Sequence, residues 1–164
     1  MYAKDTTVSA ERTKMEIEKL AAKYGASQFV SGWSGTQALV GFTMKSRMVK
    51  FFLPIPDKND EKFRHTETGR WRSPGSRADS LAEKAWEQAT RSRWRSLFLV
   101  IKAKLEAVES GITDFEKEFL AHIVLPDGST VGNWVAPQLE EIYKLRAMPN
   151  LLPGAGESSV GEDR

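Results

Sequence analysis

The stretch from Asp79 to Gly111 constrains the fold most strongly, because it predicts one long amphipathic helix with marked ends. Ser80 and Glu83 have the S-x-x-E spacing of a capping box, and Gly111 stands where a left-handed residue ends a helix. Between these ends, apolar residues recur every three or four positions, which is typical of a core-facing helix. At 1.5 Å per residue this helix is roughly 45 Å long. We therefore expect the other elements to pack around it.

The N-terminal third predicts a helix followed by a small antiparallel sheet. A helix is expected from Ala10 to Tyr24, with Ser9 as its N-cap and Gly25 just beyond its end. Apolar residues then recur at every second position instead of every third or fourth, which indicates strands separated by short turns. Three strands are expected, at Gln28 to Trp33, Thr36 to Met44 and Met48 to Ile55.

The C-terminal part predicts a helix, a hairpin and a second helix. Thr113 and Glu116 repeat the capping-box spacing, a hairpin is expected around Pro126-Asp127-Gly128, and the last helix is expected from Val135 to Met148. We predict a single α+β domain over residues 1–148, in which the helix and three-stranded antiparallel sheet pack on the long central helix, and a disordered acidic tail over 149–164. Trp86, Trp94 and Trp134 are expected in the core.

Composition limits the class of protein. The chain has 164 residues, 40% of them hydrophobic and 28% charged, which suits one globular domain. No apolar run is long enough for a membrane span, so we expect no membrane partner. The sequence has no cysteine, and its first residues contain no apolar signal core. A cytoplasmic protein without disulfides is therefore expected.

Charge is distributed unevenly along the chain. Residues 58–104 contain 12 Lys and Arg against 6 Asp and Glu, whereas residues 105–164 contain 4 against 11. A basic middle and an acidic end indicate either a surface that binds a polyanion or charges that pair within the protein. Both interpretations stay open at this stage.

The candidate binding site is a cationic surface made by a loop and the long helix. Residues 57–77 are polar and rich in turn formers, and a connection of this length predicts a mobile functional loop. Cations on one side of a protein bind phosphates, and an interleaved tryptophan suits stacking on single-stranded bases. The alternative is that the arginines pair with carboxylates. The candidates are Arg64, Arg70, Trp71, Arg72 and Arg77 in the loop and Lys84, Arg91, Arg95 and Lys102 on the helix.

No residue pattern predicts catalysis, a metal site or a cofactor. Glu118 and His122 have the i, i+4 spacing of a helical ligand pair, but a metal site needs further ligands from elsewhere. Acidic residues near the start of a helix are also expected from the helix dipole alone. We therefore expect a non-enzymatic protein with no metal and no cofactor.

The stretch from Trp94 to Trp134, which contains LVIKAKLEAVESGI, TDFEKEFLAHIVLPDGST and VGNW, resembles an uncharacterised family of small proteins encoded by bacteriophages and prophages. The resemblance extends to the strands around GFTMKSRMVKFFLP. It implies a phage protein in the host cytoplasm, acting in replication, recombination or counter-defence, and it assigns no residue a role. The order helix, meander, helix is also similar to that of double-stranded-RNA-binding domains, although Ser34-Gly35 differs from their Gly-Pro-His-type loop.

These observations predict a phage-encoded protein that binds single- or double-stranded DNA in replication or recombination. The alternative is an interaction protein that inhibits a host defence or replication factor, with a host or phage protein as its partner. The sequence leaves the oligomeric state open.

Overall fold

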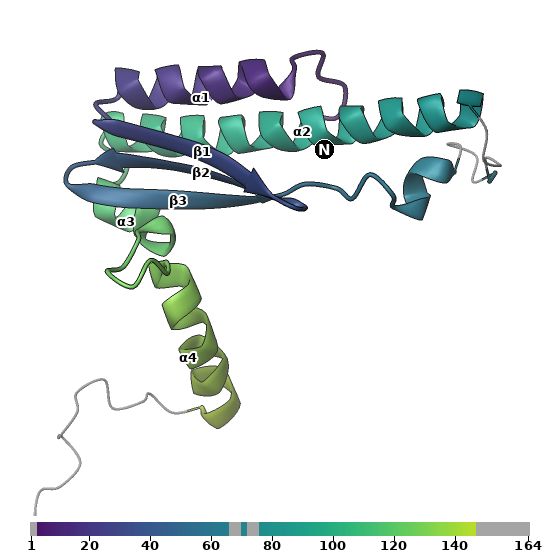
Figure 1. Ribbon diagram of the computed structural model, residues 1–164. Helices are drawn as coiled ribbons and strands as arrows, with labels where there is room; N and C mark the ends of the chain where they lie inside the picture. Colours follow the sequence, from purple (N-terminus) through teal and green to yellow (C-terminus); the bar gives the residue numbers. More distant parts are fainter. Residues whose placement is uncertain (1–2, 66–69, 72–75, 147–164) are drawn as a thin grey trace, which may run out of the picture.

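The computed structural model describes residues 3–65, 70–71 and 76–146, without the side chains of Ser76 and Arg77 (Figure 1). The predicted α+β fold is confirmed: a helix and a three-stranded antiparallel sheet pack on one long helix. The predicted tail at 149–164 lies outside the described residues. The elements are α1 (Ala10–Lys23), β1 (Gln28–Ser34), β2 (Gln37–Met44), β3 (Arg47–Pro54), η1 (Glu61–Arg64), α2 (Ser76–Glu109), α3 (Phe115–Phe119), η2 (Leu120–His122) and α4 (Val131–Leu145).

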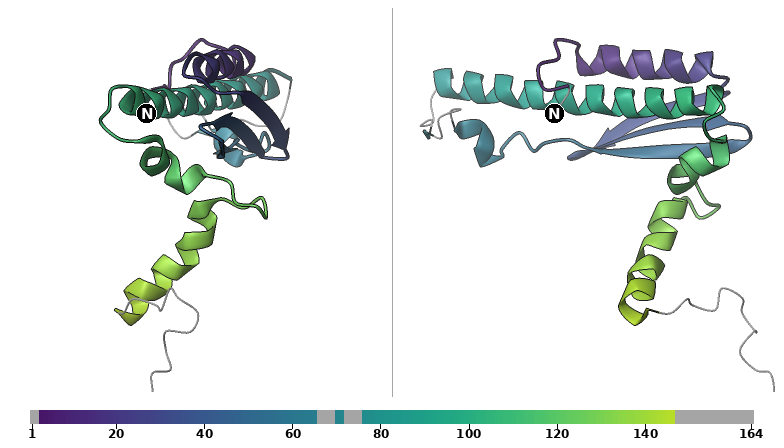
Figure 2. Two further views of the ribbon diagram at one scale, coloured as in Figure 1. Left: turned by 90° about the vertical axis from the view of Figure 1, so that its left-hand side faces the viewer. Right: turned by 180° about the vertical axis from the view of Figure 1, so that it is seen from behind.

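The sheet has the strand order β1-β2-β3, and both of its strand pairs are antiparallel. Because side chains alternate along a strand, Val40 and its β3 partner Phe51 point to the same face, and that face is buried. Helices α1 and α2 cover this face, as the end-on view in Figure 2 shows. The opposite face of the sheet, called here the outer face, points away from both helices.

The core lies between this sheet face, the two helices and α3. The Phe42 ring lies 6.3 Å from the Phe51 ring and 6.0 Å from the Phe119 ring, measured between centroids. Edge-to-face and offset aromatic contacts of this kind add stability beyond the area they bury. Trp94 and Ile101 of α2 are buried in the same cluster. The prediction that α2 carries the core is therefore confirmed.

Helices α1 and α2 run parallel to each other. Gln88 of α2 donates a hydrogen bond to the Thr6 carbonyl before α1, and Tyr24 at the end of α1 donates to Glu106 near the end of α2. Sequence numbers therefore rise in the same direction along both helices, as Figure 1 also shows.

The predicted helix-end signals at Ser9 and Gly111 are confirmed, whereas the predicted start of the long helix is wrong. Ser9 caps α1 by accepting a hydrogen bond from the Arg12 amide, and Gly111 has φ +74° after the end of α2. Helix α2 begins at Ser76, so Ser80 lies inside the helix and is not its N-cap. Glu83, the other half of the expected capping box, pairs with Lys58 at 2.6 Å instead.

The segment before α2 has more structure than the predicted loop. Residues Glu61–Arg64 form η1, and Phe63 is buried against α2. The indole nitrogen of Trp86 also donates a hydrogen bond to the Pro56 carbonyl at 2.8 Å. The first half of the predicted loop is thus held on α2, whereas residues 66–69 and 72–75 lie outside the described chain.

The C-terminal elements form in the predicted order but with different starting points. Asp114 caps α3 by accepting a hydrogen bond from the Lys117 amide, so the capping box expected at Thr113 is wrong. The hairpin is confirmed by the bond from the Leu125 amide to the Ser129 carbonyl and by a positive φ at Gly128. The last helix begins at Val131 rather than Val135.

Candidate interaction surfaces

The four cations predicted to form a stripe on α2 are all on one side of that helix, but two of them are used inside the protein. Lys84 and Lys102 are exposed. Arg95 donates a hydrogen bond to Glu16 of α1 at 2.5 Å, and its guanidinium lies 4.4 Å from the centroid of the Phe98 ring. Arg91 donates to the Gln88 side chain at 2.8 Å. Arg95 therefore helps to join α2 to α1, whereas Arg91 bonds within α2.

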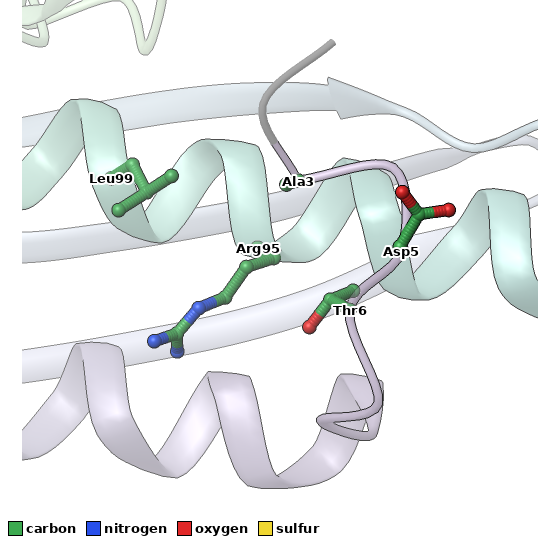
Figure 3. A pocket seen from close by; sticks show the side chains of 5 residues that line it. All are labelled: Ala3, Asp5, Thr6, Arg95 and Leu99. Atoms are coloured by element: carbon green, nitrogen blue, oxygen red, sulfur yellow. The ribbon is translucent and has the colours of Figure 1, made fainter.

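The surroundings of Arg95 show why it is not freely available. Figure 3 shows its side chain reaching from α2 towards α1, beside a hollow that is also lined by Asp5, Thr6 and Leu99. The Asp5 carboxylate points away from the guanidinium in this view. The nearest anionic partner is thus Glu16, and a phosphate would have to displace it.

The loop cations lie near η1 and the start of α2. Arg64 bonds to Asp79 of α2, and Arg70 is exposed. Trp71 is 47% exposed, and its ring meets the His65 ring edge to face with centroids 5.0 Å apart. Arg72 lies outside the described residues, as does the side chain of Arg77.

The loop group and the stripe on α2 do not form one continuous surface. The side of α2 that faces η1 is marked by Asp79, which bonds to Arg64. At 100° per residue, the four stripe cations lie roughly 120° to 160° around the helix from Asp79. The loop and the stripe therefore face different directions. Nucleic-acid binding by the nine candidate residues stays a prediction, and those whose side chains the structure describes are divided between two separate surfaces.

Glu118 and His122, which have the i, i+4 spacing of a ligand pair, each contact a different residue of the protein. Glu118 accepts a hydrogen bond from the Lys104 ammonium at 2.9 Å, and the His122 ring stacks on Phe51 with centroids 4.2 Å apart. Burial of His122 and the nearby Lys104 charge lower the pKa of the imidazole. Within the described part of the chain, no group of three His, Cys, Asp or Glu side chains could hold a metal ion.

Helix α4 is the most unusual surface feature, and its first turn is firmly attached. Thr130 is buried and caps the helix by accepting a hydrogen bond from the Asn133 amide, and the Val131 amide donates to the Ile123 carbonyl. A Cβ at Gly132 would lie 2.8 Å from the Ala121 carbonyl oxygen, so glycine permits this close approach to η2. These contacts fix the direction in which α4 leaves the body of the protein.

Beyond its first turn, α4 leads away from the helices and the sheet (Figures 1 and 2). None of its fifteen residues is buried. Tyr143 is 81% exposed and Trp134 is 56% exposed, so the prediction that Trp134 belongs to the core is wrong. Leu139 and Leu145 are exposed as well. At 100° per residue, Trp134 and Tyr143 lie about 180° apart, at the two edges of a broad apolar side that includes Val135, Leu139 and Ile142. Asn133, Glu140 and Lys144 lie on the opposite side.

An uncovered apolar helix of this length requires a physical explanation. Isolated helices of fewer than about 12–15 residues are marginal in water, and protein helices gain most of their stability by packing an apolar face. Contiguous exposed apolar side chains also mark interaction sites. Sequence periodicity identified the apolar face of α4. Only the structure shows that this face is left uncovered by the described residues.

Comparisons with known proteins give no assignment, since no protein family, curated protein or solved structure matches this chain. The resemblance to phage proteins therefore stays a prediction from the sequence. Across the helices of the described residues, none combines the length and apolar character that crossing a membrane requires.

Proposed function

We propose that this chain is a protein-binding module, and that the apolar face of α4 is its binding element. The observation that carries the proposal is that α4 presents Trp134, Leu139 and Tyr143 to solvent while burying none of its residues. Laying an amphipathic helix into an apolar groove is a common mode of protein recognition. Tryptophan and tyrosine are also the residues that most often dominate binding energy at such interfaces.

The charges of α4 favour a protein partner over a nucleic acid. Glu141 borders its apolar face, and Glu140 on the opposite side pairs with Lys144 at 2.9 Å. A carboxylate beside the apolar face would repel a phosphate backbone. This surface supports the interaction-protein alternative. We also propose that the protein is encoded by a phage and inhibits a host factor. This part of the proposal is supported by the sequence resemblance alone.

Photo-crosslinking from α4 tests this function. The photoreactive residue p-benzoylphenylalanine replaces Tyr143 in the full chain, which is then irradiated in cells that express it. The matched control replaces Met15, an exposed apolar residue on the outer side of α1. We expect a discrete protein adduct from position 143 that is absent from position 15 and is lost when Leu139→Asp is added. Equal labelling from both positions, or no adduct from position 143, contradicts the proposal.

A second candidate is single-stranded nucleic-acid binding near η1, in keeping with a role in replication or recombination. The specific observation is that Trp71 is held against His65 by a bridge between their backbones while almost half of it remains exposed. Stacking of one base on an aromatic ring contributes about 1–3 kcal/mol. Arg70, the residue before Trp71, is also exposed and supplies positive charge.

Titration of labelled single- and double-stranded DNA at about 50 mM salt tests this candidate, because such binding is strongest at low salt. Trp71→Ala should weaken single-strand binding roughly tenfold, as expected for the loss of one stacking contact. The control is Trp33→Ala, which removes an even more exposed tryptophan on β1. No binding at low salt, or the same loss from both variants, rules the candidate out.

A further inference from the structure

We infer that the groove for α4 is the outer face of the β-sheet in a second copy of this chain. The inference rests on the proposed function and names the partner of the same helix. It predicts a reciprocal dimer in which each copy lays α4 across the sheet of the other.

The outer face offers an apolar surface of suitable shape. Strand alternation places Val30 of β1, Leu39 of β2 and Phe52 of β3 on this face, and Val30 and Phe52 are 41% and 45% exposed. Gly32 and Gly41 lie on the same face between these side chains. A Cβ at Gly32 would meet no atom within 4 Å. Gly41 is buried, and a Cβ there would lie 3.1 Å from the Val30 side chain. Of these two glycines, Gly32 therefore leaves the open space beside the apolar side chains into which a residue of a helix can fit.

The lengths of the two surfaces match. Fifteen residues of helix extend about 22 Å at 1.5 Å per residue. The eight residues of β2 extend about 26 Å at 3.3 Å per residue.

The charges of the two surfaces are complementary. On the outer face of the three strands, which are described in full, Lys50 is the one charged residue and no Asp or Glu occurs. The apolar face of α4 is bordered by Glu141, which lies about 20° around the helix from Trp134. Opposite charges at the rim of an interface favour encounter and fix the orientation of the partners.

The attachment of α4 explains why its partner is a second copy rather than its own sheet. Gly132 is packed on Ala121, and the Val131 amide is bonded to Ile123, so the first turn directs α4 away from the sheet of the same chain (Figure 1). A return to that sheet requires these contacts to break. A second copy can bring the same surface to α4 without changing either chain.

Sedimentation equilibrium of the purified full chain tests the inference. We expect a dimer whose dissociation constant rises at least tenfold with Leu139→Asp on α4 and equally with Phe52→Asp on the outer face. Met15→Asp, on an exposed apolar residue of α1, is the matched control and should leave the dimer unchanged. Mixing the first two variants should restore association, because the intact helix of one copy meets the intact sheet of the other. Unchanged circular dichroism and heat unfolding confirm that each variant folds.

Each contrary outcome has a distinct meaning. A wild-type monomer at every concentration overturns the inference, and the crosslinking experiment then still decides whether α4 binds a different protein. A dimer lost with Leu139→Asp but kept with Phe52→Asp shows α4 pairing with α4, which also overturns it. Since the chain has no native cysteine, Leu139→Cys with Phe52→Cys adds a direct test. A disulfide-linked dimer supports the inference, whereas an internally closed monomer shows that α4 folds back and overturns it.

Discussion

Arg95 of α2 and Glu16 of α1 form a 2.5 Å hydrogen-bonded ion pair that joins the two parallel helices. The guanidinium also lies over the Phe98 ring, so one side chain connects the apolar side of α2 with the polar side of α1. A residue predicted to bind phosphate thus has a clear role in stability.

Replacing Arg95 with Ala should lower the free energy of unfolding by about 1–2 kcal/mol, because it removes the ion pair and the cation–π contact together. Glu16→Gln should cost less, and a double-mutant cycle in chemical denaturation should show coupling between the two positions. Lys102→Ala is the control, since Lys102 is an exposed cation on the same side of α2. If Lys102→Ala destabilises the protein equally, the stability role of Arg95 is refuted.

Gly132→Ala should destabilise the attachment of α4 although alanine favours helices by about 1 kcal/mol over glycine. The added methyl group would lie 2.8 Å from the Ala121 carbonyl oxygen, and overpacking of this kind costs about 1–3 kcal/mol. Asn133→Ala, at the next and exposed position, should change the free energy of unfolding by less than about 0.5 kcal/mol. Denaturant unfolding of both variants measures the difference, and a stabilised Gly132→Ala variant would contradict the tight contact.

His122 should make stability depend on pH in the weakly acidic range. Its pKa in the folded chain is lowered below the ordinary 6.5 by burial and by Lys104. The unfolded chain therefore binds the proton more tightly, and stability is lost as the pH falls below 6.5 towards the lowered pKa. His122→Phe keeps a ring against Phe51 but cannot titrate. Its free energy of unfolding should fall less than that of the wild type between about pH 7 and pH 5. Parallel pH dependences would refute the assignment.

Trp86→Phe should loosen the segment that contains η1. The variant keeps an aromatic ring but loses the hydrogen bond to the Pro56 carbonyl, which is worth about 1 kcal/mol. Hydrogen exchange should accelerate at residues 58–65 and stay unchanged in β2. Trp33→Phe, at an exposed tryptophan, should leave both regions unchanged. Faster exchange throughout the sheet would show that the effect of Trp86 is not local.

Much of the fold could be predicted because its determinants are local. The change of apolar period marks the boundary between α1 and the sheet, and Ser9 and Gly111 act through their own neighbouring backbone. The start of α2 was mispredicted because the S-x-x-E spacing at Ser80 also occurs inside a helix. Glu83 uses its carboxylate on Lys58, which is 25 residues away and invisible to a local pattern.

The candidate site could be predicted only in part because its geometry depends on distant contacts. The spacing of Arg91 and Arg95 correctly placed them on one side of α2. Whether these arginines are available to bind phosphate depends on their bonds to Glu16 and Gln88. Glu16 is 79 residues from Arg95 in the sequence. The spacing of apolar residues in α4 likewise placed Trp134 on an apolar face. Whether another element covers that face depends on the three-dimensional arrangement, and Trp134 is exposed.

The parallel course of α1 and α2 gives the protein an electrical polarity along its length. The peptide dipoles of the two helices point the same way and add, so both negative ends lie together near Gly25 and Gly111. Glu106 and Glu109 occupy the last turns of α2 and increase this negative field, and the hydrogen bond to Glu106 raises the pKa of the Tyr24 hydroxyl. The adjacent C-terminal ends of α1 and α2 therefore attract a cation more strongly than either helix end would alone.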